Sequence, residues 1–102
     1  MKIIKELSEM ISDEIQDAKN YADQALKFKA ENQNLAETFF KLSQAEMDHM
    51  GMLHDQATRI IETYRKEHGE PPAAMMAVYD YLHEKQMDEA AQVKAKQALY
   101  KE

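Results

Sequence analysis

Glu46 and His49 are a carboxylate and an imidazole at positions where the sequence pattern predicts apolar side chains. Apolar residues recur at helical spacing through this part of the chain, at Leu35, Phe39, Leu42, Leu53, Ala57, Ile60 and Tyr64. Continuing that spacing from Leu42 places positions 46 and 49 on the same stripe. An inward carboxylate without a partner is costly. Glu and His three residues apart on one helix face, however, can bind one metal ion together.

Glu14 is a second carboxylate on an apolar helical stripe, with apolar residues one and two turns away. A short polar cluster separates the two stripes, so we expect their helices to form an antiparallel hairpin that turns near residue 32. Glu14 lies about eighteen residues before that turn, and Glu46 and His49 lie about fourteen and seventeen after it. At ~1.5 Å per residue, the three side chains fall within about one helical turn of the same level. Two carboxylates and one imidazole converging in a mostly apolar core suit iron or manganese, and zinc is an alternative.

Each of these residues also has an ordinary structural explanation. A single Glu on an apolar face can sit at the boundary of the core and reach water, and a single inward His can be a hydrogen-bonded core residue. The three together could form a buried polar network that fixes helix register without binding metal. Glu84 and Glu89 are candidates for an additional ligand, although each also fits a solvated helix face.

The rest of the chain predicts a single all-α domain of three long helices. It has 102 residues, only two glycines and two prolines, and no strand-type alternation. We expect helices over about residues 3–30, 34–67 and 72–100, with Asn34 capping the second and Gly69 ending it. The inward residues expected in the first and third helices, besides Glu14, are Ile4, Leu7, Ile11, Ala18, Tyr21, Ala25, Phe28, Met75, Val78, Leu82, Val93 and Tyr100.

Composition excludes several classes of function. The formal charge is −6, from 19 acidic and 13 basic residues without a basic cluster, which argues against a nucleic-acid partner. The absence of cysteine excludes disulfides, thiolate zinc sites, iron–sulfur clusters and cysteine nucleophiles. No apolar run reaches membrane-spanning length, and the early charges do not fit a signal peptide. We therefore expect a cytoplasmic protein with no membrane partner.

The segment from Glu14 to Tyr21, followed by Glu46-Met-Asp-His49, resembles the first half of the rubrerythrin and ferritin-like superfamily. Those proteins carry an inward Glu on the first helix and a Glu-x-x-His motif on the second. The resemblance covers roughly residues 3–66. It implies that Glu46 would bridge two metal ions and that Glu14 and His49 would be terminal ligands. Tyr21 would contact the ligands without binding metal itself.

The chain departs from the second half of that pattern. Single-chain members repeat the motif on the third and fourth helices, but here Glu84 leads to Met87 and Glu89 to Gln92, and no fourth helix is predicted. One chain therefore supplies half of a di-metal ligand set. Two copies related by a two-fold axis would supply the full set in a four-helix core, as in encapsulated ferritins. We expect a homodimer or a higher homo-oligomer.

The resemblance implies a di-iron carboxylate protein that binds iron at a dimer-assembled site and could oxidise Fe(II) with dioxygen or peroxide. Such an activity would be of the ferroxidase type. Two alternatives stay open at this point. One is a non-catalytic structural or adaptor bundle that binds no metal, and the other is a bundle clamped by zinc without redox chemistry.

Overall fold

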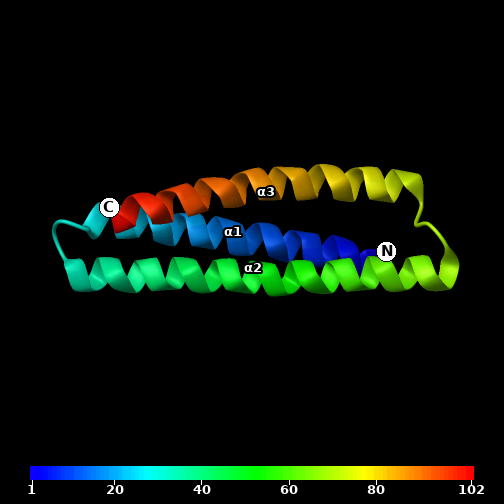
Figure 1. Cartoon of the computed structure of the whole chain (residues 1–102), viewed down its shortest axis with the longest axis horizontal. Coiled ribbons are helices and arrows are strands. Elements are labelled where there is room, and N and C mark those ends of the chain that lie inside the picture. Colours follow the sequence, from blue (N-terminus) through cyan, green and yellow to red (C-terminus); the bar gives the residue numbers. More distant parts are fainter.

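The computed structural model describes residues 1–102, which form three long helices and no strands. Helix α1 spans Lys2–Phe28, α2 spans Gln33–His68 and α3 spans Ala73–Lys101. The helices run along a rod of 55 × 19 × 18 Å, with α1 between α2 and α3 in Figure 1. None of them carries an apolar stretch of the length that crossing a membrane requires. The predicted all-α chain of three long helices is confirmed.

Asn32 joins the first two helices. Its backbone N–H donates to the Phe28 carbonyl at 2.9 Å and so closes α1, while its side-chain oxygen accepts from the Leu35 N–H at 3.1 Å and so opens α2. The prediction that Asn34 caps α2 is therefore wrong, because Asn32 already makes that bond. At the other end of α2, Gly69 has a φ of +79° and its N–H donates to the Arg65 carbonyl, as its position in the sequence predicted.

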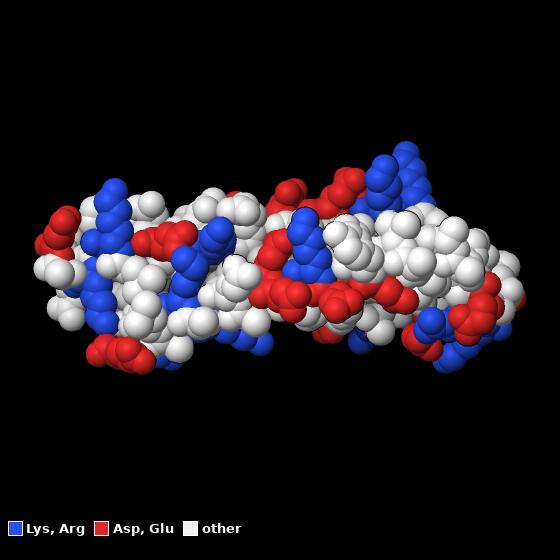
Figure 2. All heavy atoms as spheres, turned by 90° about the horizontal axis from the view of Figure 1, so that it is seen from above, with Lys and Arg blue, Asp and Glu red and all other residues white.

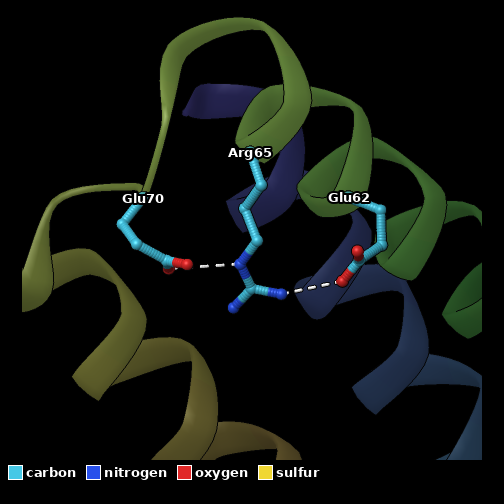
Figure 3. A network of polar contacts seen from close by, with 3 residues as sticks. All are labelled: Glu62, Arg65 and Glu70. Atoms are coloured by element: carbon cyan, nitrogen blue, oxygen red, sulfur yellow. Dashed lines mark hydrogen bonds and ion pairs between the residues drawn. The ribbon is translucent and has the colours of Figure 1, made fainter.

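Arg65 ties the end of α2 to the loop that leads into α3 (Figure 3). Its Nη1 donates to Glu62 Oε1 at 2.7 Å and its Nε donates to Glu70 Oε2 at 3.2 Å. Hydrogen bonding to these two carboxylates raises the pKa of the guanidinium. Because all three side chains are partly exposed, the contribution to stability is modest, and the main effect is to hold the loop in place.

The core follows α1 along the rod in three groups of buried residues. The central group is Ile11, Ile15, Ala18, Met50, Ala90 and Val93. One end is filled by Ile4, Leu7, Ala57 and Ile61, and the other by Ala25, Ala36, Phe40 and Tyr100. Small residues recur at the contacts of α1, which lets both neighbours pack closely on it.

The buried stripe of α2 is offset by one residue from the predicted stripe. Its buried members are Ala36, Phe40, Ser43, Met50, Ala57 and Ile61, of which only Ala57 was expected. Leu35 and Leu42 are instead 36% and 39% exposed. The apolar stripe is wide enough to cover two faces, and the chain's own helices cover only one. Val78, expected to be inward on α3, is also exposed.

The other apolar face of the α1/α2 hairpin remains uncovered, and we call it the open face. It carries Met10, Tyr21 and Phe28 on α1 and Leu35, Phe39 and Leu42 on α2, each set at helical spacing. The Phe39 ring stacks on the rings of Tyr21 and Phe28, with centroids 6.1 Å apart in both pairs. No helix of this chain packs over it.

Buried polar contacts fix α3 on α1. The Gln86 side chain is buried, and its amide donates to the Ser8 carbonyl at 3.0 Å and to Ser12 Oγ at 2.9 Å. Neither acceptor could be satisfied by an apolar residue at position 86. The contact therefore sets the register of α3 as well as its position.

Replacing Gln86 with Glu should lower the free energy of unfolding by about 1–3 kcal/mol at pH 8, because a carboxylate there can only accept and would face the Ser8 carbonyl oxygen. Urea unfolding followed by circular dichroism measures the change. Gln92→Glu, on an exposed position of the same helix, is the matched control. Equal stability of the two variants would contradict the structural role of this contact.

Candidate metal centre

The structure brings Glu14 of α1 together with Glu46 and His49 of α2, as their spacing predicted. One ligand atom of each residue lies within 4.8 Å of the other two. The His49 Nδ1 atom is 3.7 Å from Glu14 Oε2 and 3.6 Å from Glu46 Oε1. Two carboxylates and one imidazole thus face one small volume on the open face.

A buried hydrogen bond one turn away sets this convergence. Ser43 Oγ donates to the Ala18 carbonyl at 2.7 Å, and both residues are completely buried. Ala18 follows Glu14 by four residues and Ser43 precedes Glu46 by three. Because the two helices are antiparallel, these steps lead to the same level of the rod.

The three ligands lie at the edge of the core rather than within it. The side chains of Glu14, Glu46 and His49 are 27%, 18% and 54% exposed, respectively. The prediction that they converge inside a mostly apolar core is therefore wrong for the single chain. The one-residue offset of the buried stripe on α2 is the cause, since it turns positions 46 and 49 toward the open face.

The closeness of the two carboxylates shifts their proton equilibrium. The pKa of Glu46 is raised to about 7, first by hydrogen bonding with Glu14, then by burial and by the charge of Glu14. His49 opposes the shift and the nearby charge of Asp17 adds to it. Near neutral pH, Glu46 is thus close to half-protonated without a cation.

With both carboxyl groups ionised, the cluster is not a satisfied polar network. Glu14 Oε2 is buried and has no hydrogen-bond partner. The contacts of His49 Nδ1 with the two carboxylates, at 3.6 and 3.7 Å, are too long for hydrogen bonds. A network retained only to fix helix register would be expected to satisfy these atoms. The unmet oxygen and the raised pKa are both features that a bound cation would remove.

Helix α3 adds no ligand to the cluster. Glu84 is exposed, and Glu89 lies beside Ile15 and Gln16 in a different hollow of the surface. The only group of three or more potential ligands in the chain is the one described above. Tyr21 stacks on Phe39 of the open face, two turns along α1 from Glu14.

Sequence reasoning missed a contact between His54 of α2 and His83 of α3. The rings stack with centroids 4.7 Å apart and planes 19° from parallel. His83 Nδ1 is buried without a partner, and burial, together with His54, lowers the pKa of His83. The sequence does hold a signal for this contact: each histidine lies about four turns from the loop near residue 70, which places both at the same level of two antiparallel helices. Stacked rings direct their nitrogen lone pairs along parallel planes, so the pair does not converge on a metal.

Comparisons with known proteins give the chain no family. No model of a protein family, no curated protein and no solved structure matches it. The ferritin-like resemblance therefore rests on Glu14, Glu46 and His49 and on the hairpin that positions them.

In metal-free protein, the raised pKa of Glu46 should make stability fall as pH rises. The folded protein favours the protonated form of the Glu46 carboxyl. The contribution of this group to the free energy of unfolding is therefore complete below about pH 4.5 and is lost as the pH rises to about 7. Glu46→Gln keeps a neutral side chain at every pH. Its melting temperature, measured with a chelator present, should therefore exceed that of the wild type more at pH 8 than at pH 5.

Glu67→Gln is the control for this measurement, because Glu67 is exposed on the same helix. It should change the melting temperature by the same small amount at both pH values. A Glu46→Gln difference that does not grow between pH 5 and pH 8 would show that the two carboxylates do not share a proton.

Proposed function

We propose that two copies of this chain pair through their open faces and form a ferritin-like di-iron carboxylate site at which Fe(II) is bound and oxidised. The observation that carries the proposal is the convergence of Glu14, Glu46 and His49 on an apolar face that nothing in the chain covers. Neither the ligands nor the face has an evident use in the single chain.

The donor set fits a divalent metal. Carboxylate oxygens and an imidazole nitrogen suit iron, manganese and zinc. The unpartnered oxygen of Glu14 would coordinate a cation bound among the three side chains. The cation would also replace the proton that Glu46 otherwise holds. His49, the most exposed of the three, would bind on the outer side of the cluster.

A second copy would complete both the ligand set and the core. Three ligands leave a six-coordinate metal open, and two copies related by a two-fold axis supply four carboxylates and two imidazoles. Pairing would also cover Met10, which is 51% exposed, together with Leu35 and Leu42. Removing these side chains from water favours association. The result would be a four-helix core made of two hairpins.

The proposed chemistry depends on the carboxylates. Loss of an electron from Fe(II) adds one positive charge to the site, which Glu14 and Glu46 would offset in their ionised forms. Dioxygen or peroxide would accept the electrons. Iron is the substrate here, and the chain's part is to bind it, to hold the charge and to give up the proton of Glu46 when iron enters.

A Leu42→Glu variant should fail to pair, because each copy would place a carboxylate in the apolar interface close to that of its partner. Light scattering measures the mass, which should fall from at least twice the 11.9 kDa of one chain to that of a single chain. Leu99→Glu, on an exposed position of α3 away from the open face, should leave the mass unchanged. A wild-type chain that is monomeric with and without metal would refute the pairing.

A Glu46→Ala variant should lose Fe(II) oxidation, because Glu46 is the more buried of the two carboxylates and is the proposed bridge between the metal ions. Anaerobic Fe(II) titration followed by exposure to oxygen measures binding and oxidation through ultraviolet absorbance. Asp48→Ala, on an exposed position of the same helix, is the matched control. Unchanged oxidation kinetics in Glu46→Ala would refute the proposal.

Elemental analysis and mass separate the alternatives. About one iron per chain in a dimer or larger assembly supports the di-iron site. Zinc at half that ratio, with no oxidation of Fe(II), supports a zinc-clamped bundle. A metal-free dimer of undiminished stability supports a structural or adaptor bundle.

A further inference from the structure

An apolar groove of about 460 Å³ lies between the first turns of α1 and the first turns of α3, on a side of α1 that does not carry the candidate metal centre. Its apolar lining consists of Met1, Ile4, Met75, Val78, Tyr79 and Leu82. Figure 2 shows a largely uncharged surface near this end of the rod, bordered by both acidic and basic side chains.

The buried residues that α3 contributes to the core lie along the middle and the other end of the rod, whereas at this end Met76 and Tyr79 pack on the core while only partly buried. Along the middle the contacts are made by small or fully buried residues such as Ala18, Ala90 and Val93. Near its beginning, α3 presents larger side chains, and Val78 remains 60% exposed. Ile4, which is buried, belongs to the floor. The result is apolar surface that is concave and accessible.

The charge of the groove is opposite to that of the whole molecule. The charged groups at the groove are the side chains of Lys2 and Lys5 and the α-ammonium of Met1, whose nitrogen lies 3.1 Å from Met75 Sδ. The other polar groups of the lining are the hydroxyls of Ser8 and Tyr79. The two lysines are three residues apart and therefore lie on one side of α1. In a chain of charge −6, this combination of apolar walls with cations at the rim favours an anionic, chain-like ligand.

We propose that this groove binds a free long-chain fatty acid, with the alkyl chain against Ile4, Val78 and Leu82 and the carboxylate at Lys2 or Lys5. The volume lies within the range of about 300–1,000 Å³ that small-molecule sites occupy. Each buried methylene strengthens such binding about fourfold. A stable interface with another protein buries about 800 Å² and about 20–30 residues on each side, whereas nine residues line this groove.

Binding can be measured on the full chain with cis-parinaric acid, a carboxylic acid whose fluorescence rises in apolar surroundings. Dodecanoate, added below its critical micelle concentration, should displace the probe at least about tenfold more effectively than 1-dodecanol, which has the same chain length but no charge. Equal displacement by the two compounds would overturn the role of the lysines and with it the proposal.

Val78→Asp should weaken probe binding at least about tenfold, because it places a carboxylate on the groove wall. Tyr81→Asp is the matched control: Tyr81 is similarly exposed, at 67% against 60%, and lies on the same helix outside the groove. Equal binding by these two variants would refute the site.

A Lys2→Glu/Lys5→Glu double variant tests the site from the other helix. It should retain its helical circular dichroism and lose the preference for dodecanoate over dodecanol. If the preference survived, or if the protein bound only to phosphatidylglycerol vesicles and not to the monomeric probe, the groove would not be a fatty-acid site. None of the groove residues is a candidate metal ligand, so these results do not depend on iron binding.

Discussion

The hydrogen bond from Ser43 to the Ala18 carbonyl sets the register of α1 against α2, and the position of every candidate ligand depends on it. A slip of one residue would move α2 by about 1.5 Å and break the buried hydrogen bond from Ser43 Oγ to the Ala18 carbonyl. Gln97 of α3 also donates to Ser43 Oγ, at 2.9 Å. One serine side chain therefore links all three helices.

The candidate centre carries an electrostatic conflict that this register enforces. Glu14 and Glu46 are held side by side at the rim of an apolar face, where one of them keeps a proton near neutral pH. Folding alone gains nothing from that arrangement, and apolar residues at the two positions would continue the surrounding stripes. Residues whose type does not suit their position in the fold are concentrated at functional sites in proteins. The conflict is therefore the strongest structural reason to look for a cation here.

Much of the architecture could be predicted because helical spacing is a strong signal: the three helices, the hairpin and the common level of Glu14, Glu46 and His49. Which face of α2 is buried could not be predicted from the sequence. A stripe with Leu35 and Leu42 on one side and Phe40 and Ile61 on the other is apolar over two faces, and only the position of α3 decides which one the chain buries. The depth of the ligands depends on that choice, and so does the existence of an open face. The contact of His54 with His83 depends on the same placement.

Helix α1 lies between α2 and α3 (Figure 1), and the two pairs of neighbouring helices are not packed equally well. Helices α1 and α2 are adjacent in the chain and pack along most of their length, whereas α2 and α3 meet at few places, such as the His54–His83 stack. Contacts between neighbours in sequence form early in folding, and units with fewer contacts open first. Opening of α3 would break the contacts of Ala90 and Val93 with the core but not the hydrogen bond from Ser43 to Ala18 that aligns α1 and α2. Helix α3 contributes no ligand, so its opening would disturb the candidate metal centre less than opening of α1 or α2 would.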